Sequence, residues 1–541
     1  MTLLTIAIFS SLFLTLCLIP ILSKIAPFIG AIDVPDKRKI HTKPIPRIGG
    51  LAMSIAIFVT LIFSFHLNSF TKAFLISSFI IVVFGLIDDI KNLDYKLKFC
   101  AQIIACLIII YYGKVNIISV GDILSDGMYL NKFSSFLFTV FVIVGVTNAI
   151  NLADGLDGLA AGICFLSFLC IGYLAYQVKA YDIFIISIVI ASAIFGFLRF
   201  NTYPASVFMG DAGSQLLGFS GAVLSIKLTQ QSLILSSTLP LLIFGFPILD
   251  TLSVMAQRIY ERRSPFKPDK NHFHHKLLKI GLYHTEAVTL IYFIHSLLIA
   301  IAALLYFISD KVIFFFYIIF CLVILIGFFI VDKYKLTIKR YKLIVNIKDK
   351  LKILKEKSLP IMICFFLLRI VFYLIIIFMS LTLKSIPKYV FYIAIFLLIG
   401  VCTNFVWKKY SFLFSKLIKV FIYILIPVLV YFSQNSISLA FGYKISYELL
   451  YIFCIILAVL TLKLTRRKKG FKIVPTDYLV TFIILVNLVL SKTELKIFFC
   501  NTVILFYVLE ILLGELRGEL KEIYFILIIC AIILIKSYFV K

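Results

Sequence analysis

Apolar runs of about 17–25 residues recur along the whole of this 541-residue chain, and a helix of that length crosses a bilayer core of roughly 30 Å. Because 62% of the residues are hydrophobic and only 15% are charged, water cannot be the main solvent of the protein. The runs predict an all-α, polytopic integral membrane protein with about 18 transmembrane helices. They exclude a soluble fold.

Basic residues give the chain a formal net charge of +27, and most of them lie in alternate gaps between the apolar runs. A basic chain can bind nucleic acid, but this alternation is the pattern of cytoplasmic loops in membrane proteins. We therefore expect the lipid bilayer, and no nucleic acid, as a partner. The same pattern predicts that both termini are extracytoplasmic and that the polar motifs below face the cytoplasm.

The first two polar segments place charged side chains beside apolar runs. Residues 33–50 mix basic side chains with prolines and a glycine pair, which favours an irregular backbone able to approach an anion. Lys43 and Arg47 are the candidate ligands there. Further on, Asp88 and Asp89 end an apolar run, and adjacent like charges favour a cation between them. This pair is therefore a candidate magnesium or catalytic site.

The third segment repeats polar side chains at every third position: Asn148, Asn151, Asp154 and Asp157. In one continuous helix this spacing would spread the side chains over about half of the circumference. Gly155 and Gly158 instead predict a break in the helix at the membrane edge. Such a break lets side chains and backbone amides converge on a ligand.

The fourth segment contains Asn201 and, a few residues later, Asp211 between two glycines just before an apolar run resumes. Free backbone amides at a helix start suit a phosphate group. The Asp211 carboxylate is well placed to hold a metal ion that bridges to that phosphate.

The fifth segment holds three histidines, in a loop that also carries Arg262 and Arg263: His272, His274 and His275. Zinc binding is one interpretation of three histidines, but no cysteine lies nearby and the surrounding positive charge opposes a second cation. Phosphate binding is therefore favoured. Acidic, basic and glycine-bearing segments on one membrane face together indicate phosphoryl transfer between anionic substrates, one of them a lipid.

On these five segments, taken in this order, residues 1–330 resemble the polyprenyl-phosphate N-acetylhexosamine-1-phosphate transferases. The resemblance implies a bacterial inner-membrane enzyme that transfers sugar 1-phosphate from a UDP-N-acetylhexosamine to undecaprenyl phosphate and releases UMP. It also implies dependence on Mg²⁺, or on Mn²⁺ in its place. The product would be the first lipid-linked intermediate of a cell-envelope glycan.

The motifs and the resemblance together assign expected roles to individual residues. The expected catalytic residues are Asp88, Asp89, Asp154 and Asp157, and the expected metal ligands are Asp211 and Asp154. The expected substrate-binding residues are Lys43, Arg47, Asn148, Asn151, Asn201, Arg262, Arg263, His272, His274 and His275.

Several alternatives remain open at this point. The branch that transfers phospho-MurNAc-pentapeptide carries three consecutive histidines followed by an acidic residue, whereas Phe273 and Lys276 occupy two of those places here. This favours N-acetylglucosamine 1-phosphate, with another UDP-N-acetyl sugar as the alternative. A transporter of lipid-linked sugars is disfavoured because it would distribute polar residues through the membrane. Direct attack by the lipid phosphate and a covalent aspartyl intermediate both fit the sequence.

The polar motifs all precede residue 285, which suggests three parts. We expect a catalytic core at residues 1–331 with about 11 spans, a basic connector at 332–358, and a further module at 359–541 with about 7 spans. The connector is either a solvated loop or a segment lying on anionic headgroups. For the last module, packing or oligomerisation (a homodimer included), regulation and lipid handling all remain open.

Overall fold

The computed structural model consists almost entirely of helices. It describes residues 2–35, 44–65, 67–123, 129–232, 234–264, 271–336, 358–383, 388–406, 422–423, 425–433, 441–464, 474–490, 493–516 and 521–539. The helices form two units. One comprises Met1–Ile338 with Val474–Val480, and the other comprises Lys339–Ile473 with Thr481–Lys541.

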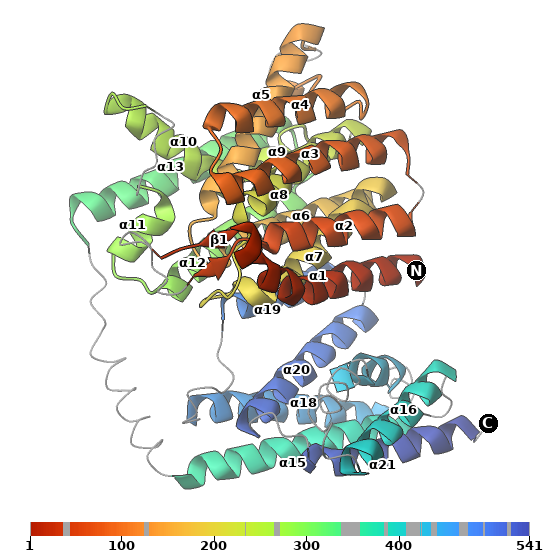
Figure 1. Cartoon of the computed structure of the whole chain (residues 1–541). Coiled ribbons are helices and arrows are strands. Elements are labelled where there is room, and N and C mark those ends of the chain that lie inside the picture. Colours follow the sequence, from red (N-terminus) through yellow and green to blue (C-terminus); the bar gives the residue numbers. More distant parts are fainter. Residues whose placement is uncertain are drawn as a thin grey trace. The chain divides into compact units, whose positions relative to one another are not determined.

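The first unit contains thirteen labelled helices within its described residues (Figure 1). They are α1 (Thr2–Ile29), α2 (Gly49–Ser64), α3 (Ser69–Lys91), α4 (Tyr95–Tyr111), α5 (Lys132–Ala153), α6 (Leu159–Gln177), α7 (Tyr181–Asn201), α8 (Gly210–Gln231), α9 (Leu239–Ile243), α10 (Gly245–Tyr260), α11 (Phe273–Lys279), α12 (His284–Leu304) and α13 (Asp310–Lys333). A 3-10 turn, η1, covers Gly121–Ile123, and the short strands β1 (Ile32–Asp33) and β2 (Ile45–Pro46) pair in antiparallel fashion.

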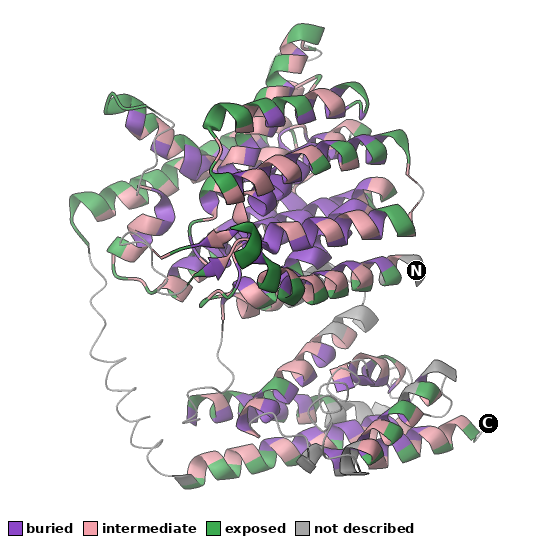
Figure 2. Ribbon diagram, in the orientation of Figure 1, coloured by how far each residue is buried: buried purple, intermediate pink, exposed green. Residues whose placement is uncertain are grey.

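Helix α8 is the centre of this unit, because it packs against α2, α3, α5, α6, α7 and α9. Almost every side chain from Ala212 to Ser225 is buried, and Figure 2 shows the buried residues concentrated in the interior of the unit. In Figure 1, α1, α2, α3 and α4 run side by side. A motif at the start of α8 is therefore surrounded by the ends of several other helices.

The second unit contains α15 (Ser358–Thr382), α16 (Lys388–Val406), α18 (Phe441–Leu464), most of α19 (Pro475–Leu490), α20 (Thr493–Glu515) and α21 (Lys521–Phe539). Its apolar core forms where α15 packs against α18, α20 and α21. Two charged side chains in its apolar helices lie beside aromatic groups. Glu510 accepts a hydrogen bond from the Tyr423 hydroxyl, and the Arg369 guanidinium lies over the Phe366 ring.

Eight helices in the described part of the chain are long and apolar enough to cross a membrane. They cover Ile6–Ile29, Ser69–Lys91, Lys132–Ala153, Leu159–Gln177, Tyr181–Asn201, His284–Leu304, Asp310–Lys333 and Leu359–Thr382. The prediction of an all-α, multi-pass membrane protein is thus confirmed. The total of about 18 spans and the side of the termini stay predictions. So do the boundaries at 331 and 359, because residues 337–357 lie outside the described residues.

Candidate active site

Polar motifs predicted from sequence meet where α2 and α8 begin and α3 ends. The Gly50 N–H donates to the Met209 carbonyl at 2.8 Å, and a side chain on Gly50 would collide with the Gly213 backbone. Gly85 in α3 likewise faces the Ala212 backbone with no room for a side chain. Close backbone approach through small residues is typical of helix packing in membranes. It brings the end of α3 directly against the start of α8.

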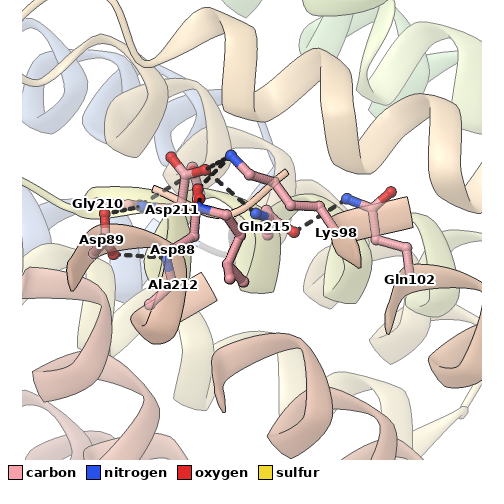
Figure 3. A network of polar contacts seen from close by, with 10 residues as sticks. Asp88, Asp89, Lys98, Gln102, Gly210, Asp211, Ala212 and Gln215 are labelled. Atoms are coloured by element: carbon pink, nitrogen blue, oxygen red, sulfur yellow. Dashed lines mark hydrogen bonds and ion pairs between the residues drawn. The ribbon is translucent and has the colours of Figure 1, made fainter. Parts of the chain in front are cut away.

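Asp89 uses both carboxylate oxygens to hold the start of α8 (Figure 3). Its Oδ1 accepts the Asp211 N–H at 2.9 Å, and its Oδ2 accepts the Ala212 N–H at 3.1 Å. The residue is only 6% exposed, and α8 has no side-chain cap from its own N-cap residue, Met209. The first N–H groups of a helix lack partners within that helix and favour negative charge. Asp89 therefore caps α8 from a neighbouring helix.

Asp88 is turned toward a lysine instead. Its Oδ1 accepts the Leu93 N–H at 2.6 Å, and its Oδ2 forms an ion pair with Lys98 in α4. The Lys98 ammonium also lies 3.0 Å from Asp211 Oδ2, so it sits between two carboxylates (Figure 3). Lys98 is not among the site residues predicted from sequence. The available signal was its position near the start of the helix that follows the aspartate pair.

The third motif joins this group through Asn151 and Asp154. Helix α5 ends at Ala153 and α6 begins at Leu159, which confirms the predicted break. The Asn151 side chain hydrogen-bonds Asp211. Burial, together with the charges of Asp211 and Asp157, raises the pKa of Asp154 to about 7. We call Asp88, Asp89, Asp154 and Asp211 the acidic cluster.

Arg47 is the basic residue of the first segment that reaches the acidic cluster. Its guanidinium forms an ion pair with Asp33 of β1, and its backbone N–H donates to the Ala31 carbonyl at 2.9 Å. Its charge is close enough to act on Asp89 and Asp154. Lys43, predicted to bind substrate, lies outside the described residues.

Asp157 and Asn201 join the third motif to the loop before α8. The Asp157 carboxylate accepts the Ala205 N–H at 2.9 Å, and the Asn201 amide oxygen accepts the Gly158 N–H at 3.0 Å. The Asp157 N–H donates to His284 Nε2 at 3.1 Å, and His284 is a residue that sequence reasoning missed. These contacts order the loops around the acidic cluster.

Asn148 lies behind the acidic cluster. Its amide donates to Gln102 at 2.9 Å and to the Val144 carbonyl at 2.8 Å. Gln102 in turn donates to Gln215, one turn after Asp211, at 3.1 Å (Figure 3). Gln102 and Gln215 are both buried, so these amides form a polar layer between α4, α5 and α8.

The histidine motif lies beside the third motif. The His274 ring packs against Gly155, where a side chain would collide with it. Burial and the neighbouring His275 lower the pKa of His274 to about 3, so this imidazole is neutral at neutral pH. His275 is half-buried, whereas Arg262 and Arg263 are exposed after α10, where Arg263 lies 3.4 Å from Glu261. No contact of the described residues joins these two arginines to the acidic cluster.

The donor atoms of the acidic cluster suit a hard cation. The Asp88 and Asp211 carboxylate oxygens converge on the Lys98 ammonium, and the Asn151 side chain hydrogen-bonds Asp211. Among the described residues, no three His, Cys, Asp or Glu side chains are spaced to hold one metal ion. Magnesium is commonly bound by one or two carboxylates and completed by substrate phosphates and water. The residues therefore fit a metal whose remaining ligands come with the substrate.

The chain is similar in sequence to known transferases. Residues 71–229 match glycosyl transferase family 4. The chain is 39% identical over 292 residues to the probable undecaprenyl-phosphate N-acetylglucosaminyl 1-phosphate transferase of Bacillus subtilis (strain 168), covering 53% of this chain and 81% of that protein. It is 30% identical over 308 residues to the undecaprenyl-phosphate alpha-N-acetylglucosaminyl 1-phosphate transferase of Escherichia coli (strain K12), covering 56% and 82%.

A third relative is the decaprenyl-phosphate N-acetylglucosaminephosphotransferase of Mycolicibacterium smegmatis, 35% identical over 295 residues, with 49% of this chain and 72% of that protein covered. The helical membrane fold and these similarities define a membrane-bound glycosyl transferase. The chain belongs to glycosyl transferase family 4, among the polyprenyl-phosphate N-acetylglucosamine-1-phosphate transferases. The expected family is confirmed.

Proposed function

We propose that the protein transfers N-acetylglucosamine 1-phosphate from UDP-N-acetylglucosamine to undecaprenyl phosphate and releases UMP. The observation that carries the proposal is the Lys98 ammonium between Asp88 and Asp211, at the meeting point of α3, α4 and α8. Phosphoryl transfer depends mainly on positioning and on neutralising negative charge. The names of the B. subtilis and E. coli relatives support N-acetylglucosamine over other sugars.

In the proposed reaction, an oxygen of the lipid phosphate forms a bond to the β-phosphorus of the UDP-sugar. The bond from that phosphorus to the oxygen bridging the two phosphates breaks, and this oxygen leaves with UMP. Lys98 would attract the phosphate groups into the acidic cluster, and Asp88 would orient Lys98. Charge-assisted contacts of this kind are among the strong ones in proteins.

We favour direct attack by the lipid phosphate over an aspartyl intermediate. Both oxygens of Asp89 already accept backbone N–H groups. One oxygen of Asp88 accepts the Leu93 N–H, and the other is paired with Lys98. A carboxylate engaged on both oxygens is a poor nucleophile, so neither residue is well placed for covalent catalysis.

For the metal, we propose that Asp211, with Asn151 and the neighbouring Asp154, would hold Mg²⁺, or Mn²⁺ in its place, together with substrate oxygens. Bound there, the ion would supply positive charge to the diphosphate. The carboxylates of Asp211 and Asp154 support this proposal, because Mg²⁺ and Mn²⁺ prefer oxygen ligands.

We further propose that the reaction takes place at the cytoplasmic face of a bacterial inner membrane. The alternation of loops rich in basic residues with loops that carry few charges supports this side. A donor that carries a nucleotide diphosphate is also too polar to be drawn from the bilayer.

The test uses the full-length protein in lipid nanodiscs with undecaprenyl phosphate, each of several UDP-N-acetyl sugars, and Mg²⁺, Mn²⁺ or EDTA. We expect UMP release with UDP-N-acetylglucosamine and a divalent ion only. Release only with UDP-MurNAc-pentapeptide would refute the sugar, and no release with any donor would refute the reaction.

A matched pair of lysine variants tests the role of Lys98. Lys98→Met should lower kcat by about 100-fold or more, as loss of one transition-state donor does. Lys227→Met is the control: Lys227 donates to the Lys114 carbonyl at 3.2 Å, about 24 Å along α8 from Asp211. Equal activities of the two variants would contradict the proposed role.

A further inference from the structure

Asp250 is a buried carboxylate in α10 that neither the sequence motifs nor the proposed reaction uses. It is 4% exposed. Its Oδ1 accepts the Phe273 N–H at 2.8 Å, and its Oδ2 lies 3.0 Å from His272 Nδ1. One carboxylate therefore holds both the first N–H of α11 and the imidazole that precedes this helix.

The start of α11 has a second anchor that does not depend on Asp250. The Phe273 ring is 1% exposed and stacks on Phe328 of α13, with the ring centroids 4.5 Å apart and the planes 5° from parallel. It also packs against Phe246 of α10. Because these aromatic contacts fix the backbone, a substitution of Asp250 that keeps one acceptor oxygen should leave α11 in place.

His272, whose imidazole contacts Asp250, belongs to the histidine motif that lies beside the third motif. The rings of His272 and His274 are stacked 5.7 Å apart, and the His274 ring packs against Gly155. His274 is neutral at neutral pH, so it is poorly suited to attract an anion. In His272, Nδ1 faces Asp250, which leaves Nε2 as the ring nitrogen available to a substrate.

We propose that Asp250 is a positioning residue which, through His272, orients the diphosphate of the nucleotide donor. The carboxylate accepts the Nδ1 proton and fixes the ring so that Nε2, when it also carries a proton, donates to an oxygen of the diphosphate. A carboxylate behind a functional imidazole commonly fixes its orientation and tautomer in this way. This inference rests on the proposed function, because it gives Asp250 a role in binding the UDP-sugar of that reaction.

The test compares Asp250→Asn with the wild-type full-length protein in nanodiscs. An asparagine can still accept the Phe273 N–H, but its amide nitrogen cannot accept the Nδ1 proton of His272. We expect a donor KM about 10- to 100-fold higher, the loss typical of such supporting carboxylates. The KM for undecaprenyl phosphate should stay unchanged. A merely structural role would lower the active fraction and leave the donor KM as it is.

Two histidine variants test whether Asp250 acts through His272. His272→Asn can still donate to Asp250 but lacks Nε2, and we expect the same rise in donor KM from it. In the double variant the two effects should not multiply, since both remove one interaction. A wild-type donor KM in either single variant, or multiplied effects, would overturn the proposal. If Asp250→Asn does not fold, His272→Asn alone decides between these outcomes.

Asp310→Asn is the matched control. This carboxylate accepts the Thr238 N–H at 3.1 Å and lies about 27 Å along α13 from Phe328, so the donor KM should not change.

Calorimetric titration with UDP gives a readout independent of turnover. Weaker UDP binding in Asp250→Asn supports the proposal whatever sugar is transferred. A wild-type protein that binds UDP but releases no UMP refutes only the proposed reaction, and one that does neither refutes both.

Discussion

Replacing Asp89 by asparagine tests whether this residue is a helix cap or a reacting group. Asp89 accepts the N–H groups of Asp211 and Ala212, the second and third residues of α8, at 2.9 and 3.1 Å. The asparagine keeps one acceptor and turns an NH₂ group toward the other N–H. One hydrogen bond to a charged group is worth about 1.5–3 kcal/mol, and the lost charge at the helix terminus adds about 0.3–1 kcal/mol. The free energy of unfolding should therefore fall by about 2–4 kcal/mol.

At about 2 °C per kcal/mol for a chain of this size, the Tm of Asp89→Asn should be lower by about 4–8 °C. The matched control is Asp88→Asn, which keeps an acceptor for the Leu93 N–H and weakens an ion pair with the partly exposed Lys98. The free energy of unfolding of Asp88→Asn should be lower than that of the wild type by about 1 kcal/mol or less. UMP release should nevertheless fall more in Asp88→Asn, because Asp88 touches Lys98.

The two variants are compared by thermal unfolding of the full-length protein in one detergent, followed by fluorescence. An unchanged Tm for Asp89→Asn would refute the capping role. A larger Tm decrease in Asp88→Asn than in Asp89→Asn would show that the two roles are reversed.

Three further variants test other parts of the site. Asp211→Asn should abolish Mg²⁺-dependent UMP release while the protein still inserts into membranes, and undiminished turnover would remove Asp211 from the metal site. Because burial lowers the pKa of His274 to about 3 from 6.5, the unfolded state binds the extra proton between these values. The Tm should therefore fall as the pH decreases from 6.5, and it should fall less in His274→Gln. An equal dependence of Tm on pH in the two proteins would contradict this. Gly85→Ala should lower the Tm and UMP release, because the new methyl group meets the Ala212 backbone at a cost of about 1–3 kcal/mol. Gly145→Ala, which meets nothing within 4 Å, should change neither, and similar effects of the two would refute the packing argument.

Local properties of the sequence were sufficient to predict the helical membrane fold and the helix break. The length and polarity of a span depend on the bilayer, which acts on each segment separately. The break between Ala153 and Leu159 follows from Gly158, which adopts φ +80° at the start of α6, a conformation that favours glycine. The family could also be predicted, because its motifs are short and contiguous.

The roles of individual side chains within those motifs could not be predicted in the same way. Asp88 and Asp89 are adjacent in sequence, yet one faces Lys98 and the other caps α8. Which of them meets the N–H groups of α8 depends on the rotation of α3 against α8, and the contact of Gly85 with Ala212 constrains that rotation. Lys98 follows the aspartate pair but had no predicted role, and Asp250 escaped prediction because it stands in no polar motif.

The sequence by itself therefore determined the surroundings of this protein, its helices and the set of groups available for chemistry, since these depend on composition and on neighbouring residues. Only the tertiary structure decided which carboxylate caps a helix, which one pairs with Lys98 and which one holds His272. The physical reason is that a buried carboxylate needs hydrogen-bond donors. Here those donors come from other segments of the chain, and helix packing brings them within reach.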